Sequence, residues 1–377
     1  MKKLLIFDFH DHSSNPRTYR GYKSLKGKYE LFGLGYVAPV DSLVQFLTIP
    51  KPKWTLKMKL IQRFWLLFRR YEHVYWNLPQ VKSAEEILKD KEFDIIIAHN
   101  EESLPLVLKY KKNAKVIVDM HEYAPKEFEH SFWWRFYFAP YKHYLCQTYL
   151  PKADYVYTVN QGFAEEYQKN YGIKCGVITS AAYYFAPPPQ LFAQDSKNIK
   201  LIYHGIASPE RGIEEMIKTM DYVDSRFSLD LMLVATYHQD YFQILKDMTE
   251  NRKNVRIIPP VSFEEIIPFS STYDIGFYIL QPKNYNGFYA LPNKFFEFIQ
   301  ARLAIAIGPN PEMARLVKQY NLGIISKDFT PESMAEELNK LTKEQILHYK
   351  ENANQTAKIL NAEREREKIL GIIEEIL

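Results

Sequence analysis

A lysine and a glutamate stand three residues apart in the stretch Leu291–Gly308, LPNKFFEFIQARLAIAIG. Pro292 suits the first turn of a helix, and Lys294 and Glu297 then share one face of that helix. The free N–H groups and partial positive charge of a helix start, with a lysine beside them, favour phosphate binding. Glu297, one turn further, can accept hydrogen bonds from a ribose diol. The alternative is an ordinary ion pair on a solvated helix face.

A second group of candidates follows the apolar run Ile199–Tyr203, which we interpret as a buried strand. Gly205 comes directly after this run, and a residue without a side chain there lets the backbone approach a ligand closely. Arg211 stands just before the helical run that starts at Ile213, where its fork of donors can hold a diphosphate. The alternative is a plain strand–turn–helix connection with an exposed arginine.

The end of another predicted strand carries a histidine between two acidic residues, in the run Val118–Tyr123. His121 and Glu122 are placed there to bind or protonate a ligand, because ligands of parallel α/β sheets bind at the carboxyl ends of the strands. Arg17 follows the first strand in a loop that faces the same edge of the sheet. It can contact a phosphate, an acidic acceptor or only solvent.

Metal binding and several enzyme classes lack their motifs in this sequence. His10-Asp11-His12 offers ligand atoms, but alternate residues of an extended chain point to opposite sides and no further ligands stand out, so we predict no metal site. The sequence holds no P-loop, no GxGxxG after the first strand, no GxSxG and no HExxH. ATPase, dehydrogenase and serine hydrolase functions therefore lose their best support.

The composition is that of a globular protein with room for two domains. The chain has 377 residues, 46% hydrophobic and 25% charged, and its net charge of +4 is too small to indicate nucleic-acid binding. Cys146 and Cys175 have no metal-type spacing and fit a reducing compartment. Asp8 interrupts the apolar run at the N-terminus too early for a signal peptide, and no run approaches a membrane span. We expect a cytosolic protein, or one attached to the cell membrane at its inner face.

Short apolar runs alternate with helical patterns through most of the chain, which is typical of parallel βαβ units. We predict strands at Leu4–Phe9, Tyr29–Leu34, Asp94–Ala98, Lys115–Asp119, Tyr155–Val159, Ile199–Tyr203, Leu229–Val234, Val255–Ile258, Asp274–Ile279 and Leu303–Ile307. Pro187-Pro188-Pro189 interrupts this alternation, and we interpret it as a linker. The sequence thus predicts an α/β protein with two Rossmann-like, doubly wound domains, residues 1–185 and 190–358, that face a central cleft. We expect a last helix, residues 359–377, to pack back on the first domain.

The segment 51–76, KPKWTLKMKLIQRFWLLFRRYEHVYW, does not follow this alternation. Its apolar residues recur at helical spacing and are interleaved with lysines and arginines. A basic amphipathic helix of this kind can lie on an anionic membrane, and the aromatic cluster 132–138 can extend the same surface. An apolar stripe on a helix is more often packed into a core, so we favour core packing over contact with a membrane or a lipid acceptor.

Together these residues resemble a GT-B glycosyltransferase of the family-4 type, the group that builds polysaccharides and lipid-linked glycans from nucleotide sugars. The resemblance is carried by Asn15–Arg17 for the family's DPR, Asp119–Glu122 for DxHE, the segment Asp154–Tyr167, Gly205–Gly212 for the GR…KG loop, and Leu291–Ala304 for lpnKlFEyma.g. The last motif is the most specific, and the motifs together span nearly the whole chain.

The resemblance implies transfer of a sugar from a nucleotide-diphosphate sugar to a glycan or lipid-linked acceptor, with retention of anomeric configuration and without a metal or other cofactor. Lys294 would hold the donor diphosphate, Glu297 the ribose hydroxyls, and Gly205 would let its loop close over the phosphates. Arg211 takes the place of the family lysine. His121 would contact the transferred sugar near the reacting carbon.

The acceptor side is expected to involve Arg17 and Glu122. We expect no nucleic-acid partner. Contact with the inner face of the cell membrane, where it occurs, would use the segments 51–76 and 132–138.

Two departures from the family pattern leave other functions open. The arginine expected after Gly205 is Ile206, and the first acid of the family's paired-glutamate motif falls near Tyr289. Asn286 and Gly287 can fill part of that role through backbone N–H groups, so we count them among the donor-binding residues. The alternatives are a catalytically silent GT-B homologue that binds glycan or a partner enzyme, and a GT-B sugar-nucleotide epimerase.

Overall fold

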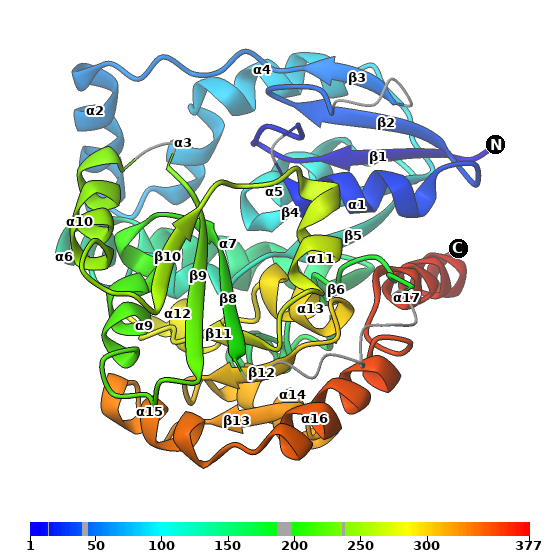
Figure 1. The fold of residues 1–377 in the computed structure, drawn as a ribbon. Coiled ribbons are helices and arrows are strands. Elements are labelled where there is room, and N and C mark those ends of the chain that lie inside the picture. Colours follow the sequence, from blue (N-terminus) through cyan, green and yellow to red (C-terminus); the bar gives the residue numbers. More distant parts are fainter. Residues whose placement is uncertain (14, 40–43, 187–197, 236–237) are drawn as a thin grey trace. The chain divides into compact units, whose positions relative to one another are not determined.

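The computed structural model describes residues 1–13, 15–39, 44–186, 198–235 and 238–377 (Figure 1). The chain divides into two compact units. The first contains Met1–Thr179, Asn284–Asn286 and Glu365–Leu377, and the second contains Ser180–Lys283 and Gly287–Arg364. The triple proline that we interpret as a linker, residues 187–189, lies outside the described residues.

The first unit is built on a parallel sheet in the order β3-β2-β1-β4-β5-β6-β7. The strands are β1 (Lys3–Phe7), β2 (Glu30–Gly35), β3 (Gln45–Thr48), β4 (Ile95–His99), β5 (Lys115–Met120), β6 (Tyr155–Thr158) and β7 (Cys175–Val177). Leu4 pairs with Leu31 on one side and Ile95 on the other, so β1 lies in the middle of the sheet. β1 and β4 are nearly continuous apolar runs, which is typical of parallel strands covered on both faces.

Helices alternate with these strands along the chain. They are α1 (Pro16–Leu25), α2 (Leu56–Leu67), α3 (Tyr71–Trp76), α4 (Pro79–Leu88), α5 (Asn100–Tyr110), α6 (Phe132–Tyr137), α7 (Ala139–Tyr149) and α8 (Gln161–Tyr171), with short 3-10 turns at Ala124–Lys126 and Leu150–Lys152. The side chain of Asn15 caps α1 by accepting hydrogen bonds from its first backbone N–H groups, and Asn160 caps α8 in the same way. The last helix, α17 (Ala362–Ile376), adds the fully buried Ile373 to the core formed by Leu4 and Ile95.

The second unit has a parallel sheet in the order β10-β9-β8-β11-β12-β13. The strands are β8 (Ile199–Ile206), β9 (Phe227–Val234), β10 (Val255–Ile258), β11 (Ile275–Tyr278), β12 (Ala304–Ile307) and β13 (Gly323–Ile325). The helices are α9 (Ile213–Thr219), α10 (Gln239–Thr249), α11 (Ile266–Ser270), α13 (Asn293–Gln300), α14 (Pro311–Tyr320), α15 (Pro331–Lys340) and α16 (Lys343–Thr356), with 3-10 turns η4 (Pro209–Arg211) and η5 (Phe263–Glu265). The short helix α12 (Tyr285–Phe288) begins in the first unit and ends in the second. One large apolar core joins this sheet to its helices.

Every predicted strand coincides with an observed strand, with ends that differ by up to three residues. The strands that the sequence does not predict are β3, β7 and β13, and each is the outermost strand at one edge of its sheet. The prediction of two Rossmann-like α/β domains is confirmed by the two parallel sheets and their alternating helices.

The prediction that the segment 51–76 packs into a core is wrong for α2. Leu56 and Phe64 of this helix are 74% and 52% exposed. The following helix, α3, does pack inward and buries Tyr71 and Tyr75. Among the helices described, none is both long enough and apolar enough to cross a membrane.

Candidate functional site

Lys294 lies in the first turn of α13, which begins directly after Pro292. Its ammonium group donates a hydrogen bond to the hydroxyl of Tyr203 at 2.8 Å and lies 4.0 and 4.3 Å from the ring centroids of Tyr203 and Tyr278. The residue is only 8% exposed, so the interpretation as an ordinary ion pair on a solvated helix face is wrong. Burial lowers the pKa of Lys294 well below its usual range, and the positive charge of Arg211 lowers it further.

Gly205 brings the backbone of β8 against this lysine. Its φ of +149° lies in the region that favours glycine, and a Cβ atom there would lie 3.0 Å from the Nζ atom of Lys294. The backbone at Gly205 therefore closely approaches Lys294, and the approach to a ligand that the sequence predicts here stays a prediction.

Arg211 ends the turn η4 just before α9. The next residue, Gly212, has a φ of +62°, and a Cβ atom there would lie 3.3 Å from the carbonyl oxygen of Ile279. The tight turn keeps the η4 segment against the end of β11. The positive charge of Arg211 also acts on Lys294, whose pKa it lowers.

Glu297 and His204 form the second part of this site. Glu297 is 7% exposed, and its Oε2 atom lies 3.5 Å from Nε2 of His204. Burial and the charge of Lys294 lower the pKa of His204 to about 3, so its imidazole is neutral at pH 7. Within the described residues this buried Nε2 atom has no hydrogen-bond partner. Sequence reasoning missed His204, although its place between a strand and Gly205 was a usable signal.

The structure thus places Gly205, Arg211, Lys294 and Glu297 near the carboxyl ends of β8 and β11, and their donor-binding role stays a prediction. Ligands of parallel α/β sheets bind at this edge. Two cations beside a helix N-terminus can hold a diphosphate, and a buried carboxylate beside them can accept hydrogen bonds from hydroxyl groups.

In the first unit, Arg17 has a different position from the one predicted. It lies in the first turn of α1 rather than in a loop, and its side chain is only 11% exposed. Its Nε atom donates to both carboxylate oxygens of Asp119 at 2.8 Å, and its Nη1 atom donates to the carbonyl oxygen of Ile178 at 3.0 Å. Burial raises the pKa of Asp119, but Arg17, His121 and His99 together outweigh this effect, so the pKa is lowered.

His121 is held by a second histidine at the end of β4. The Nε2 atom of His121 lies 2.7 Å from Nδ1 of His99, and its backbone N–H donates to the Oδ1 atom of Asn100 at 3.2 Å. Because one imidazole must donate to the other, the tautomer of His121 is tied to that of His99. Burial lowers the pKa of His121 to about 4.

His99, Asp119 and His121 offer ligand atoms within 4.8 Å of one another and are the described group that could hold a metal ion. Both oxygens of Asp119 already accept hydrogen bonds from Arg17, and the guanidinium charge opposes a second cation at the same place. The geometry therefore favours a polar network over a metal centre.

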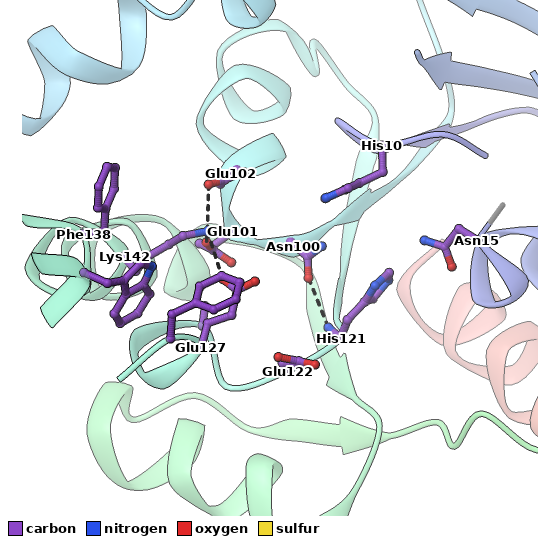
Figure 2. A pocket seen from close by; sticks show the side chains of 13 residues that line it. His10, Asn15, Asn100, Glu101, Glu102, His121, Glu122, Glu127, Phe138 and Lys142 are labelled. Carbon is purple, nitrogen blue, oxygen red and sulfur yellow. Dashed lines mark hydrogen bonds and ion pairs between the residues drawn. The ribbon is translucent and has the colours of Figure 1, made fainter. Parts of the chain in front are cut away.

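Figure 2 shows a pocket of about 450 Å³ in the first unit, beside this network. It lies at the carboxyl ends of three neighbouring strands, because its walls include His10 after β1, Asn100 and Glu102 after β4, and His121 and Glu122 after β5. His121 and Glu122 line the pocket as the sequence predicts, whereas Arg17 is not among its lining residues. The position matches the ligand-binding edge of an α/β sheet.

Sequence reasoning missed several charged groups of this pocket. Lys142 from α7 donates hydrogen bonds to Glu101 at 2.5 Å and to Glu102 at 2.7 Å, and a carboxylate oxygen of Glu127 lies 3.8 Å away. His10, which the sequence offers only as a metal ligand, instead contacts the carboxylate of Asp8 at 2.7 Å. The sequence did contain a signal for these residues, because Glu101 and Glu102 follow closely after the strand β4, at the edge of the sheet where ligands bind.

Asn286 contacts the acceptor-side segment. Its amide donates to a carboxylate oxygen of Glu122 at 2.9 Å and accepts from the backbone N–H of Tyr123 at 3.2 Å. The carbonyl oxygen of Gly287 accepts a hydrogen bond from Asn310 at 3.3 Å. The donor-binding role expected of the Asn286 and Gly287 backbone N–H groups stays a prediction.

Comparisons with known proteins identify the family resemblance. Residues 49–179 match the model of Glycosyltransferase Family 4. A search of curated protein sequences found no match.

Solved structures with a similar fold include HepE from Anabaena in complex with UDP and glucose, which is 12% identical with a TM-score of 0.72 over the full length of both chains. An E. coli trehalose-6-phosphate protein bound with UDP-2-fluoro glucose is 10% identical, with a TM-score of 0.71 over 100% of this chain and 99% of that one. A glycosyltransferase from Rickettsia africae is 14% identical, with a TM-score of 0.71 over 100% of this chain and 98% of that one. The resemblance to a family-4-like GT-B glycosyltransferase, stated from sequence motifs, is confirmed.

Proposed function

Because residues 49–179 carry a glycosyltransferase family 4 domain in a chain with the GT-B fold, we propose that the protein transfers a sugar from a nucleotide-diphosphate sugar to a glycan or lipid-linked acceptor. The observation that carries the proposal is the burial of Lys294 beside Arg211, Gly205 and Glu297 at the carboxyl end of the second sheet. The solved structures of HepE and of the E. coli protein hold UDP or a UDP sugar, which supports a nucleotide-sugar donor.

The two cations have a specific task in this reaction. When the bond between the sugar and the diphosphate breaks, negative charge grows on the leaving diphosphate. Lys294, Arg211 and the first N–H groups of α13 are fixed where they can stabilise that charge, and their buried surroundings strengthen the interaction. A bound diphosphate in turn favours the protonated form of Lys294, whose pKa is low in the free protein.

Glu297 binds the other end of the nucleotide in this proposal. Its carboxylate accepts hydrogen bonds from the ribose hydroxyls, and the neutral His204 beside it provides an imidazole nitrogen for the same ligand. A hydroxyl group that donates to this buried nitrogen would remove the cost of leaving it without a partner. His121 is the group proposed to contact the transferred sugar.

We also propose that transfer retains the anomeric configuration and needs no divalent cation. Retention follows from the family resemblance, and metal independence follows from the positive charge that Lys294 and Arg211 already supply. Proton NMR of the product, recorded during turnover, distinguishes retention from inversion. Unchanged turnover after treatment with EDTA is the result expected of a metal-independent enzyme, and loss of turnover restored by Mg²⁺ would contradict it.

A nucleotide-sugar panel tests the main proposal. Purified protein is incubated with UDP, GDP, ADP and CMP sugars, and its melting temperature and the release of free nucleotide are recorded. A ligand that binds only the native protein raises the melting temperature by mass action, so at least one nucleotide diphosphate sugar should do so and be hydrolysed or transferred. A panel without any shift would overturn donor binding.

A catalytically silent homologue is the second candidate, because Ile206 at the end of β8 is 44% exposed where the family pattern has an arginine. In that case a nucleotide sugar, glycan or partner enzyme binds without turnover. The same panel separates the two candidates, since a thermal shift without release of nucleotide, in the presence of glycan acceptors, favours the silent homologue.

We further propose that the acceptor is presented at a membrane surface and that the protein docks there. The docking surface, named here the α2–α6 surface, consists of exposed apolar residues on two helices in contact. They are Leu56, Leu60, Ile61, Phe64, Leu67 and Phe68 from the α2 segment, and Phe132, Trp133 and Phe136 from α6. Exposed basic residues flank them at Lys53, Lys57, Lys59, Arg63, Arg69 and Arg70. Apolar and basic side chains side by side match the acyl boundary and the anionic headgroups of a bilayer.

A further inference from the structure

The pocket of the first unit restricts the chemistry of the acceptor, and this inference rests on the proposed transferase function. Four glutamates, Glu101, Glu102, Glu122 and Glu127, contribute to its walls. Of the residues described as lining it, Lys142 is the one with a permanent positive charge. The pocket therefore carries an excess of negative charge.

The charge of Lys142 is already matched inside the protein. Its ammonium is bound by Glu101 at 2.5 Å and Glu102 at 2.7 Å, and the side chain is only 12% exposed. An anion that entered the pocket would have to compete with these two carboxylates for one buried cation. Leaving a buried charge without its partner is strongly unfavourable, so Lys142 does not act as an anion receptor here.

The raised pKa of Glu127 agrees with the excess of carboxylates in the pocket. Burial, together with the charges of Glu101 and Glu122, raises the pKa of Glu127 to about 7, although the charge of Lys142 acts in the opposite direction. A phosphate or carboxylate placed beside Glu127 would meet the same repulsion that these neighbouring carboxylates already exert.

The remaining walls suit a sugar ring. Phe128, Trp134 and Phe138 form an aromatic side, and aromatic rings present a negative face to the C–H groups of a saccharide. On the opposite side Figure 2 shows the His10 imidazole directed toward the region of Asn100 and Glu102. Aromatic walls with a few convergent polar groups are typical of small-molecule sites of this volume.

His10 is also oriented for a hydroxyl group. Its Nδ1 atom lies 2.7 Å from the carboxylate of Asp8, which is fully buried. This hydrogen bond fixes the orientation of the imidazole and raises the pKa of His10. The carboxylates of the pocket accept from the O–H and N–H groups of a sugar and repel a phosphate, and the charge that His10 gains on protonation is already matched by the carboxylate of Asp8.

We infer that the sugar entering this pocket is uncharged or carries an amine, and that sugars with a phosphate or carboxylate on that ring are excluded. The excess carboxylates, the matched Lys142 and the aromatic wall of Phe128, Trp134 and Phe138 support the same conclusion. Every residue named here belongs to the first unit.

Binding of matched saccharides without any donor tests the inference. The probes are methyl glycosides of glucose, galactose and mannose, each compared with its 2-amino, 6-phosphate and uronate forms, and the readout is tryptophan fluorescence. We expect the neutral and amino members of at least one series to bind, and their anionic partners to bind about 100-fold more weakly, because like charges in a buried site repel strongly. The change in fluorescence should be lost in Trp134→Phe, which keeps an aromatic ring but removes the reporter.

Two variants and a matched control locate the selection in the pocket. Glu102→Gln keeps the shape of the side chain and leaves Glu101 to hold Lys142, so we expect discrimination against the 6-phosphate to fall about tenfold, corresponding to about 1.4 kcal/mol. Glu122 accepts a hydrogen bond from Asn286. Glu122→Gln should also reduce discrimination against the 6-phosphate, and it replaces the first variant if Glu102→Gln does not fold. Glu86→Gln removes an exposed charge on α4 and should change nothing.

The inference is overturned if an anionic member binds as tightly as its neutral partner, or if no saccharide of any series binds. The melting temperature of the same protein with nucleotide sugars is measured as well. It tests the proposed transferase function independently of the saccharide preference. A shift with UDP sugars combined with a preference for anionic saccharides would overturn the inference alone. Binding of neutral saccharides without any nucleotide shift would overturn the proposed function alone.

Discussion

Lys294 combines a positive charge with an aromatic surrounding. The rings of Tyr203 and Tyr278 attract the ammonium group through their electron-rich faces without neutralising its charge. The nearby charge of Arg211 raises the cost of keeping Lys294 protonated in the free protein. A diphosphate between these cations removes that cost, so the site gains more from an anion than an exposed lysine would.

Replacing Lys294 or Glu297 by alanine should weaken nucleotide binding without unfolding the protein. Each change removes a charged partner of the donor, and a hydrogen bond to a charged group contributes about 1.5 to 3 kcal/mol, which corresponds to about a tenfold to hundredfold loss of affinity for UDP. Isothermal titration calorimetry measures the affinity, and circular dichroism checks the fold. Lys318→Ala, an exposed lysine on α14, is the matched control. Unchanged affinity in both active-site variants would contradict the assignment.

Three buried histidines should make the protein sensitive to mild acid. Burial is the main cause that lowers the pKa of His12 and His121 to about 4 and that of His204 to about 3. The unfolded chain binds these protons near pH 6.5, so stability is complete above this value and is lost as the pH falls toward the folded-state pKa values. We expect the urea midpoint at about pH 5 to lie clearly below that at about pH 7.5.

A pair of variants separates this effect from general acid denaturation. His204→Asn should reduce the difference between the two midpoints, whereas His130→Asn, at an exposed position, should leave it unchanged. The raised pKa values of Glu127 and His10 act in the opposite direction, so the comparison of His204→Asn with the wild-type protein isolates the effect of His204. A full wild-type difference between the two midpoints in His204→Asn would contradict the burial of a neutral His204.

At the scale of elements, the central strands were predictable and the sheet edges were not. β1 and β4 are continuous apolar runs because both of their faces are covered. β3 is short and half exposed, so its sequence, QFLT, carries little of this signal. β13 contains Gly323, where a Cβ atom would collide with the backbone of Ile305, and this requirement is visible only in the paired sheet.

The candidate site likewise has a part that the sequence predicted and a part that it did not. Lys294 and Glu297 belong to one helix, so their spacing alone predicted a shared ligand. The aromatic surroundings of Lys294 come from other elements, because Tyr203 lies on β8 and Tyr278 on β11. Lys142 and Glu101 are 41 residues apart, and only the packing of α7 against α5 brings them into one pocket.

The strand–turn element at Gly205 makes a separate prediction. Gly205→Ala forces a side chain into a φ of +149° and places a methyl group 3.0 Å from the Nζ atom of Lys294. We expect nucleotide affinity to fall about tenfold or more while the fold is retained, because strain of this kind costs about 1 to 3 kcal/mol. Gly371→Ala in α17 is the control, since nothing lies within 4 Å of its added methyl group. Calorimetry should show normal UDP affinity in the control, and normal affinity in Gly205→Ala would contradict the close approach.

At the scale of the whole molecule, the α2–α6 surface stands out from the other exposed regions. Single exposed apolar residues are common on proteins, but several large ones on two helices in contact form a contiguous patch. The lysines and arginines beside this patch would repel a second copy of the same surface. They would be attracted to anionic lipid, which also carries the acyl chains that cover apolar side chains.

The last prediction follows from that surface. The protein should sediment with vesicles that contain anionic phosphatidylglycerol more than with neutral vesicles, and added salt should reduce the effect, because each basic residue near the surface contributes about 1 kcal/mol at low salt. Replacing both Phe64 and Leu67 by serine should lower vesicle binding about tenfold or more, since burial of such a side chain contributes about 1.5 to 3 kcal/mol. Ile244→Ser, at a position 52% exposed on α10, removes a comparable apolar side chain elsewhere and should have no effect. Sedimentation that depends neither on anionic lipid nor on salt, or that falls equally in the Ile244 variant, would show that the α2–α6 surface is covered by something other than a membrane.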